Sequence, residues 1–214
     1  MDYREFMNRE EYDPQLMAME AAQDLQLREK LLGEEPDPDR VYTVADIADL
    51  PEGLFAELDD GKVFYMDAPA ATHQEIAVEM HLAVANHIKA KGGGCKVYIP
   101  PYGVYLKNDD KTYFLPDLTV ICDHSKLDEK GCHGAPDWIV EVTSPSTKKR
   151  DYGMKLFRYR TAGVREYWII DPQRRTVMVY VFDAKPEDAS LYSFEDEISP
   201  SLYPDLKIRL ADVV

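Results

Sequence analysis

Two acidic side chains and one lysine stand in sequence contexts where they could hold a metal ion. Glu141 lies inside the apolar run 138–142, which is too short and too β-branched for a helix and therefore predicts a buried strand. A charge buried in a strand is costly unless it has a partner. The candidate partners are Asp117, in a second apolar run, and Lys155 in the segment that follows. Two carboxylates on strands and one lysine suit a hard divalent cation and a water molecule for it to activate.

The elements that must position these residues alternate between short strands and helices from Val41 onward. The longest predicted helix starts at Thr72, where Glu75 completes a capping box, and ends at the glycines 92–94. Its apolar face repeats every four residues at Ile76, Met80, Val84 and Ile88. Further helices are predicted over 43–50 and 147–161, and strands over 54–58, 62–66, 96–99, 103–106, 112–123, 137–143, 166–170 and 176–182. This order predicts an α/β or α+β domain in which helices pack against a sheet.

The N-terminal 40 residues are expected to form a separate acidic extension. Residues 14–32 have the composition and apolar spacing of an amphipathic helix, and the proline-rich acidic stretch 34–40 reads as a linker. The predicted organisation is therefore a helical extension and linker over 1–40 and one domain over 41–214. Packing of the helix on the domain or on a second subunit, and a regulatory or partner-binding arm, are both open.

Composition and cysteine content limit the classes of protein to which the chain can belong. The chain has 214 residues, 45% of them hydrophobic and 30% charged, which is typical of a globular protein. No apolar stretch approaches the roughly 20 residues of a membrane span, and the first residues lack the pattern of a signal peptide. Three cysteines are an odd number and too few for a disulfide framework, in agreement with a reducing compartment. The expected location is the cytoplasm.

The net charge of -15 argues against a nucleic-acid partner until its distribution is considered. Residues 1–40 carry 12 acidic and 5 basic side chains, whereas residues 135–175 carry 9 basic and 5 acidic ones. A polyanion could therefore dock near Glu141 despite the total charge.

The ordered segments FAELDDGKVFYM, ATHQEI, LPDLTVI and APDWIVEVTSPSTKKRDYGMKLFRYRTAGVREYWIIDP resemble the Uma2 family, also called DUF820, of restriction endonucleases. The resemblance runs from about Val41 to Phe182. It implies a PD-(D/E)XK nuclease core, in which a central mixed sheet is flanked by helices and metal-binding acids lie on adjacent strands. The Pro-Asp element matches Pro116-Asp117, and the second acid matches Glu141. The alternative for Asp117 is a turn residue that follows a proline at a strand end, and the alternative for Glu141 is a buried structural ion pair.

The chain departs from the superfamily pattern at the lysine. The superfamily places it two residues after the second acid, but Thr143 occupies that position. Lys155 in the next helix fits the role, as a catalytic base, a group that orients the water or a charge stabiliser. Helical spacing puts it on the same face as Asp151 and could aim its ammonium at the metal site. The alternative for the Asp151 and Lys155 pair is an ion pair on a solvated surface.

The resemblance also implies supporting residues and partners. Glu57 matches a recurrent family acid and could be an outer metal ligand or hold a water molecule; the alternative is a charge in the hairpin. His73 matches a recurrent family histidine and could contact phosphate or metal; the alternative is a capping or packing role. Ser144 and the basic triplet Lys148, Lys149 and Arg150 begin the helix after Glu141, where amide dipoles and positive charge favour a phosphate. A charged, solvated helix face is the alternative for the triplet. The implied function is a Mg²⁺-dependent endonuclease, with Mn²⁺ as a substitute, that acts on nucleic acid, chiefly DNA. A homodimer and no membrane partner are expected.

Three alternatives remain open. A catalytically silent nucleic-acid-binding or assembly module could keep the nuclease fold. Paired carboxylates can also act on a sugar. Cys122, His124, Cys132 and His133 could bind structural zinc, although their spacing is tighter than zinc sites use.

Overall fold

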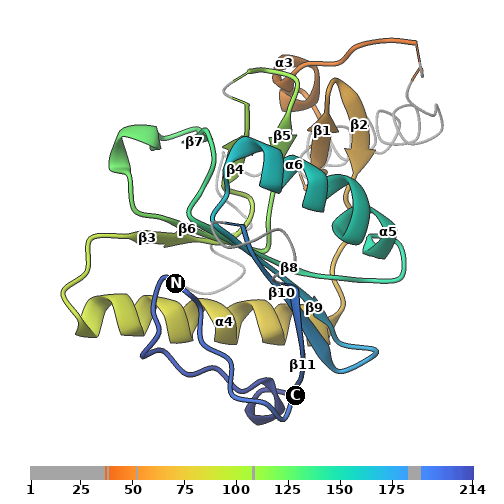
Figure 1. Cartoon of the computed structure of the whole chain (residues 1–214). Helices are drawn as coiled ribbons and strands as arrows, with labels where there is room; N and C mark the ends of the chain where they lie inside the picture. Colours follow the sequence, from red (N-terminus) through yellow and green to blue (C-terminus); the bar gives the residue numbers. More distant parts are fainter. Residues whose placement is uncertain (1–36, 38, 52, 108, 183–188) are drawn as a thin grey trace, which may run out of the picture.

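The computed structural model describes residues 37, 39–51, 53–107, 109–182 and 189–214. The helix predicted over 14–32 lies outside these residues. Within them the chain forms a mixed α/β fold with two sheets and a few helices, drawn in Figure 1. The predicted α/β class is confirmed, but the strands divide between two sheets where one central sheet was expected.

The larger sheet has six strands in the order β11-β10-β9-β8-β6-β3. Its strands are β3 (Lys96–Tyr98), β6 (Leu118–Ile121), β8 (Trp138–Val142), β9 (Glu166–Asp171), β10 (Thr176–Val181) and β11 (Ala189–Ser193). Only β8 and β9 run parallel, and the other neighbours are antiparallel. A parallel pair needs a crossover connection, and the helical segment 148–162 supplies it.

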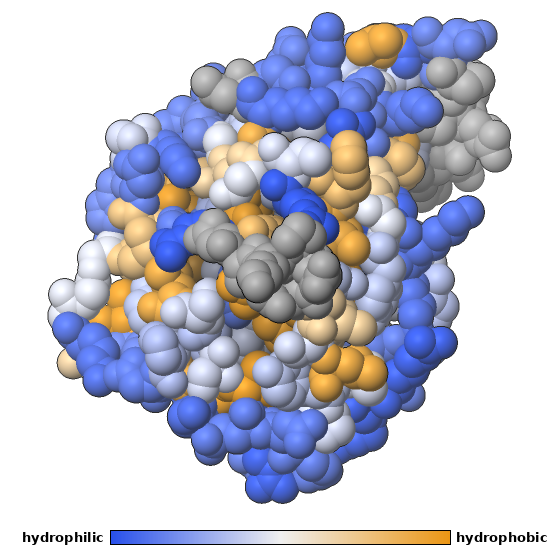
Figure 2. Space-filling model, viewed as in Figure 1, coloured by the Kyte–Doolittle hydropathy of each residue, from blue (hydrophilic) through white to orange (hydrophobic). Residues whose placement is uncertain are grey.

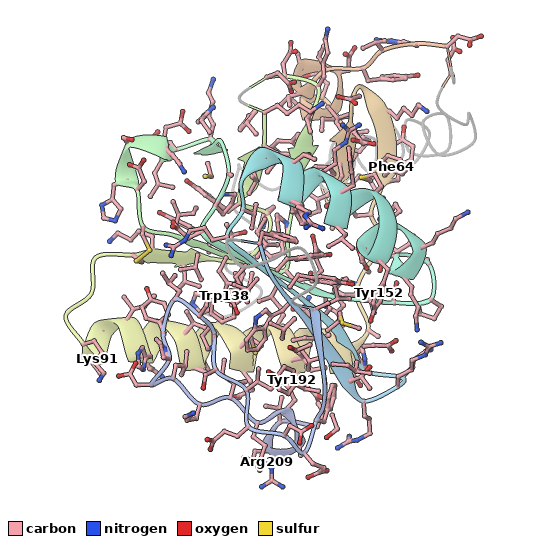
Figure 3. The ribbon with its side chains drawn as sticks, viewed as in Figure 1. Phe64, Lys91, Trp138, Tyr152, Tyr192 and Arg209 are labelled. Carbon is pink, nitrogen blue, oxygen red and sulfur yellow. A yellow bond between two sulfur atoms is a disulfide. The ribbon has the colours of Figure 1, made fainter. Side chains whose placement is uncertain are left out.

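The helix α4 (Ala71–Ala90) packs on one face of this sheet, below it in Figure 1. Its predicted apolar face is confirmed, because Ile76, Met80, Val84 and Ile88 are all buried in one core with alternate residues of β6, β8 and β9. Trp138, labelled in Figure 3, belongs to this core. The predicted capping box is wrong: α4 begins at Ala71 after an uncapped Ala70, so Thr72 already lies inside the first turn.

The opposite face of the six-stranded sheet meets the crossover helix and the second sheet. Ile139 of β8 and Tyr167 and Ile169 of β9 point to this side, where they form a second core with Tyr159 and Phe114. Since side chains alternate along a strand, Glu141 shares the face of Ile139. Glu141 is therefore directed toward the crossover helix and away from α4.

The second sheet has five strands in the order β2-β1-β5-β4-β7, with β4 and β7 parallel. Its strands are β1 (Ala56–Asp59), β2 (Lys62–Tyr65), β4 (Gly103–Tyr105), β5 (Tyr113–Phe114) and β7 (Gly131–His133). The predicted hairpin about Asp60 and Gly61 is confirmed, and both residues have positive φ. The short helix α3 (Val44–Ala48) follows Thr43 as expected.

The strand predicted over 112–123 is instead two strands in different sheets. β5 ends at Phe114 and β6 begins at Leu118, with Pro116 between them. Proline has no N–H to donate to a ladder, so a continuous strand through it is disfavoured. The break places Asp117 at the start of β6, where the chain leaves one sheet for the other.

The crossover consists of α5 (Lys148–Arg150), a π-helical turn (Asp151–Lys155) and α6 (Leu156–Ala162). It ends at Gly163, which adopts the left-handed conformation with φ 91°. π-Turns within helices occur often at functional sites. Here the turn holds two of the predicted site residues, Asp151 and Lys155, and buries both.

The inference that the cysteines are reduced is wrong for two of them. Cys95 and Cys122 form a disulfide, while Cys132 is free and buried. The two bonded residues extend the antiparallel register of β3 and β6 by one position, which brings their side chains together. The count of cysteines therefore gives no support to a reducing compartment. Among the described residues, no helix has the length and apolar character to cross a bilayer.

Candidate active site

Asp117 and Glu141 face one another across two neighbouring antiparallel strands. The register pairs Leu118 of β6 with Val140 of β8, and one further step along both strands sets Asp117 opposite Glu141. Side chains opposite one another in an antiparallel pair have Cβ atoms about 4.5–5.5 Å apart. Both predicted acids therefore lie at the same end of the sheet, where β6 begins and β8 ends, and both are buried.

Among the described residues, each of the two carboxylates makes its hydrogen bonds and ion pairs through one oxygen. Asp117 Oδ2 accepts a hydrogen bond from the Val142 amide at 2.7 Å, and His73 Nε2 lies 3.1 Å from the same oxygen in an ion-pair contact. Glu141 Oε1 accepts hydrogen bonds from Lys155 Nζ at 2.8 Å and from the Tyr159 hydroxyl at 2.7 Å. No described residue donates a hydrogen bond to Asp117 Oδ1 or to Glu141 Oε2. Each acid therefore retains one oxygen for another ligand.

Lys155 lies at the centre of the acidic groups. Its Nζ is 2.8 Å from Glu141 Oε1, 2.8 Å from Glu57 Oε1 and 4.0 Å from Asp151 Oδ1, and the residue is only 3% exposed. Burial lowers the pKa of a lysine, but the charges of Glu141, Glu57 and Asp151 outweigh this effect and raise the pKa of Lys155. The ammonium is therefore protonated as it stands, which favours charge stabilisation or orientation over a role as a base.

Glu57 comes to this point from the second sheet. Its position in β1 is fully buried, and Oε1 also accepts a hydrogen bond from the Leu115 amide at 3.1 Å. The Arg150 guanidinium lies 3.7 Å from Oε2, beyond hydrogen-bonding distance, so Oε2 has no hydrogen-bond partner. Glu57 is thus part of the buried cluster, and the alternative of a solvated hairpin charge does not hold.

The charges in this cluster do not balance. Burial raises the pKa of Glu141 well above its ordinary value; Lys155 opposes the rise, while the nearby Asp117, Asp151 and Glu57 charges add to it. Burial likewise raises the pKa of Asp151. Acidic groups in excess of basic ones in a buried site are the environment that a bound cation would relieve.

Asp151 and Ser144 lie near the start of the crossover, in different environments. Asp151 is 1% exposed, and its Oδ1 has no hydrogen-bond partner. Ser144 contacts Thr147, both through its amide at 3.0 Å and through its hydroxyl at 3.2 Å, and Ser146 through its hydroxyl at 3.0 Å. The Ser144 contacts are those of a turn residue ahead of the helix, and none of them is made to the acids.

His73 contacts an acid directly. Its Nε2 lies 3.1 Å from Asp117 Oδ2, and its Nδ1 is buried without a hydrogen-bond partner. Burial opposes protonation, but the hydrogen bond and charge of Asp117 outweigh it and raise the pKa of His73. The geometry makes His73 an orienter of Asp117.

The basic triplet predicted to bind phosphate is divided among three environments. Lys148 forms an ion pair with the buried Asp171, and Arg150 lies over the Phe64 ring at 4.9 Å while it approaches Glu57. Figure 3 shows Phe64 on the hairpin beside this end of the crossover. Lys149 is exposed and has no ion pair with a described residue. Of the three basic side chains of the triplet, Lys149 is the one without an ion pair to a described residue.

Tyr159 is the site residue that the sequence reasoning missed. It lies four residues after Lys155, as Lys155 lies four after Asp151, so the three form one helical stripe directed at Glu141. That spacing was visible in the sequence. An aromatic residue in a helix was indistinguishable from ordinary core until the hydrogen bond from its hydroxyl to Glu141 was seen.

The zinc alternative does not fit, because Cys122 is in the disulfide and Cys132 Sγ donates to the Gly134 carbonyl oxygen. In the described part of the chain, no three or more His, Cys, Asp and Glu side chains are grouped as a ready-made metal site. Magnesium does not require one, since it is commonly bound by one or two carboxylates together with waters and substrate phosphates. Asp117 and Glu141, each with a free oxygen, fit that mode of binding.

The order α4, β3, β6, β8, crossover helix and β9 defines a nuclease-like α/β domain of the expected kind, with Asp117 directly before β6 and Glu141 on the adjacent β8. The chain belongs to the Uma2 family: the family model, described as "Putative restriction endonuclease", matches residues 23–211. The resemblance found in the sequence is thereby confirmed, and the match begins within the predicted N-terminal extension.

Two relatives extend this result. A crystal structure of a "putative nuclease belonging to DUF820" from Anabaena variabilis matches with a TM-score of 0.63 and 21% identity, over 80% of this chain and 96% of that one, which shows a shared fold. The uncharacterized protein slr1290 of Synechocystis sp. is 30% identical over 100 residues, or 47% of this chain. The match covers 51% of the Synechocystis protein, so the chain spans about half the length of that curated relative.

Proposed function

We propose that this protein is a metal-dependent endonuclease that hydrolyses phosphodiester bonds of nucleic acid, with DNA as the expected substrate and Mg²⁺, or Mn²⁺ in its place, as the cofactor. One observation carries the proposal: Asp117 and Glu141 lie opposite one another, each with an oxygen free of hydrogen bonds, beside the buried ammonium of Lys155. Family membership supports the same reaction class.

Asp117 and Glu141 would hold the cation through their free oxygens. A bound Mg²⁺ supplies Lewis-acid stabilisation of phosphate charge and a water of lowered pKa. The residues of the chain then have distinct roles. Lys155, held by Glu141 and Glu57, supplies positive charge to the developing pentavalent phosphate. His73 and the Val142 amide fix the orientation of Asp117.

Nucleic acid would approach beside the crossover, where Lys149 offers an exposed positive charge. Lys148 and Arg150 remain proposed contacts, although each would have to leave or share its partner in this structure. We expect Lys149→Ala to weaken DNA binding and to reduce its salt dependence by about one phosphate contact. Lys207→Ala, which alters a lysine paired with Glu197, is the matched control.

The proposed assembly is a homodimer that acts in the cytoplasm, with the extension 1–40 separate from the domain 41–214. Phe157 and Leu191 are 60% and 63% exposed, and Figure 2 shows apolar side chains in the middle of one face within a hydrophilic surround. A contiguous exposed apolar patch marks an association surface, whereas single exposed apolar side chains do not. Sedimentation equilibrium would give the subunit number directly.

The second candidate function is a silent nucleic-acid-binding or assembly module. Its support is the lack, within the described residues, of a ready-made group of three metal-ligating side chains, together with the net charge of -15, which favours an assembly role over nucleic-acid binding. Supercoiled plasmid nicking separates the two functions. Wild type with Mg²⁺ should nick the plasmid, whereas wild type with EDTA and the near-isosteric Glu141→Gln should not. Plasmid binding without nicking in wild type at any Mg²⁺ or Mn²⁺ concentration would favour the silent module.

A further inference from the structure

The carboxylate of Glu141 is held by two donors that reach the same oxygen. Lys155 Nζ and the Tyr159 hydroxyl lie 2.8 Å and 2.7 Å from Oε1. Two donors on one oxygen fix both the torsion of the carboxylate and which oxygen it leaves available. Rotation of the group would break both hydrogen bonds, one of them charge-assisted.

The Tyr159 ring is itself held in place by neighbouring aromatic side chains. It is fully buried and makes edge-to-face contacts with Phe114 at 5.6 Å and with Tyr167 at 4.9 Å between ring centroids. Such contacts restrict the ring, so the hydroxyl is presented at one point in the core.

We propose that Tyr159 is a positioning residue for the cation site: with Lys155 it occupies Oε1 of Glu141 and so leaves Oε2 as the oxygen that meets the cation. This inference rests on the proposed function, because it assigns a role toward the same cation. Groups that hydrogen-bond to metal ligands orient them, and their removal typically lowers metal affinity about 10- to 100-fold.

The test compares two tyrosine-to-phenylalanine variants in the same aromatic core. Tyr159→Phe removes the hydroxyl and keeps both ring contacts. Tyr180→Phe removes a hydroxyl that has no hydrogen bond to a described residue, from a ring that stacks on Tyr167 at 6.2 Å. Mn²⁺ affinity is measured for each protein without nucleic acid, by electron paramagnetic resonance of the free ion, and circular dichroism reports the fold.

We expect Tyr159→Phe to fold and to bind Mn²⁺ about 10- to 100-fold more weakly than wild type, and Tyr180→Phe to bind within twofold of it. Wild-type affinity in Tyr159→Phe would overturn the positioning role and leave the proposed cation site intact. Failure of wild type to bind Mn²⁺ would overturn both. Unfolding of Tyr159→Phe would also overturn the role, because the hydroxyl would then be required for the fold itself.

Discussion

Glu57 and Lys155 are 98 residues apart in the sequence, and their Oε1 and Nζ atoms are 2.8 Å apart in the structure. This contact joins the hairpin of one sheet to the crossover helix of the other. It also gives Lys155 a second carboxylate partner besides Glu141, so the lysine is held between two sheets.

Neutralising Glu57 should weaken both the fold and the site. Glu57→Gln removes a buried charge that faces Lys155 and should lower the free energy of unfolding by about 1–3 kcal/mol. Plasmid nicking should fall about 10-fold or more, because Lys155 loses one of the two groups that place it. Urea unfolding and nicking rates measure the two effects.

Asp60→Asn is the matched control for Glu57→Gln. Asp60 is in the same hairpin, but its ion pairs with Arg158 and Lys107 are at the surface and its side chain is 51% exposed. A surface pair of this kind contributes less than about 1 kcal/mol. Equal losses of stability and nicking in the two variants would show that Glu57 has no special relation to Lys155.

The Lys148 and Asp171 pair should make stability depend on acid. Burial opposes ionisation of Asp171, but hydrogen bonds from Lys148 and the Arg174 amide outweigh it and hold the pKa of Asp171 below its ordinary value of 3.8. A depressed native pKa means that the unfolded chain takes up the proton first as the pH falls. This contribution is therefore fully present above about pH 4 and is lost as the pH falls through the native pKa.

Unfolding by urea at pH 7 and at pH 3 tests this linkage. Asp171→Asn should remove a contribution on the order of 1 kcal/mol at pH 7 and lose less stability than wild type on acidification. Lys148→Met completes a double-mutant cycle. Additive effects of the two substitutions on the free energy of unfolding at pH 7 would contradict the pairing. Lys148 would then be free to contact nucleic acid.

The disulfide predicts a response to reductant. Cys95 and Cys122 are separated by 27 residues, and closing a loop of that length stabilises a fold by about 3–4 kcal/mol in the chain-entropy model. Reduction, or a Cys95→Ser and Cys122→Ser double variant, should lower the free energy of unfolding by up to this amount. Nicking should be unchanged, because Cys122 lies at the opposite end of β6 from Asp117. Cys132→Ser is the control, and identical stability with and without reductant would show that the bond is absent.

Two glycines in the described part of the chain should respond in opposite directions to alanine. A Cβ at Gly153, within the π-helical turn, would meet nothing within 4 Å, so Gly153→Ala should stabilise the fold by about 0.4–1 kcal/mol. A Cβ at Gly103 would lie 2.1 Å from the Tyr113 ring, so Gly103→Ala should destabilise it by about 1–3 kcal/mol. Thermal unfolding of the two variants distinguishes these outcomes. Destabilisation by Gly153→Ala would mean that the π-turn requires glycine.

Short-range patterns were sufficient to predict most elements. The apolar repeat of α4 and the Asp-Gly hairpin depend on neighbours in the sequence, and both are present where expected. The placement of Asp117 opposite Glu141 was expected only from the family resemblance, which implies metal-binding acids on adjacent strands. The division into two sheets could not, since it depends on how Pro116 redirects a run that is apolar throughout.

The missed contacts are those that depend on tertiary packing. Nothing in the local sequence of Glu57 shows that it meets Lys155 across two sheets. The Cys95 and Cys122 bond depends on the register of β3 with β6, and the number of cysteines carries no information about register. The role of Tyr159 became visible only through the direction of one hydroxyl.

The proposed nuclease function depends most on a cation site formed by Asp117 and Glu141. A crystal soaked in Mn²⁺ and measured at the manganese absorption edge tests it without a choice of substrate. We predict one anomalous peak within bonding distance, about 2.0–2.3 Å, of both Asp117 Oδ1 and Glu141 Oε2. A crystal soaked to saturation with Mn²⁺ that shows no anomalous peak between these two carboxylates, or shows manganese only at other positions, would contradict the proposed cation site.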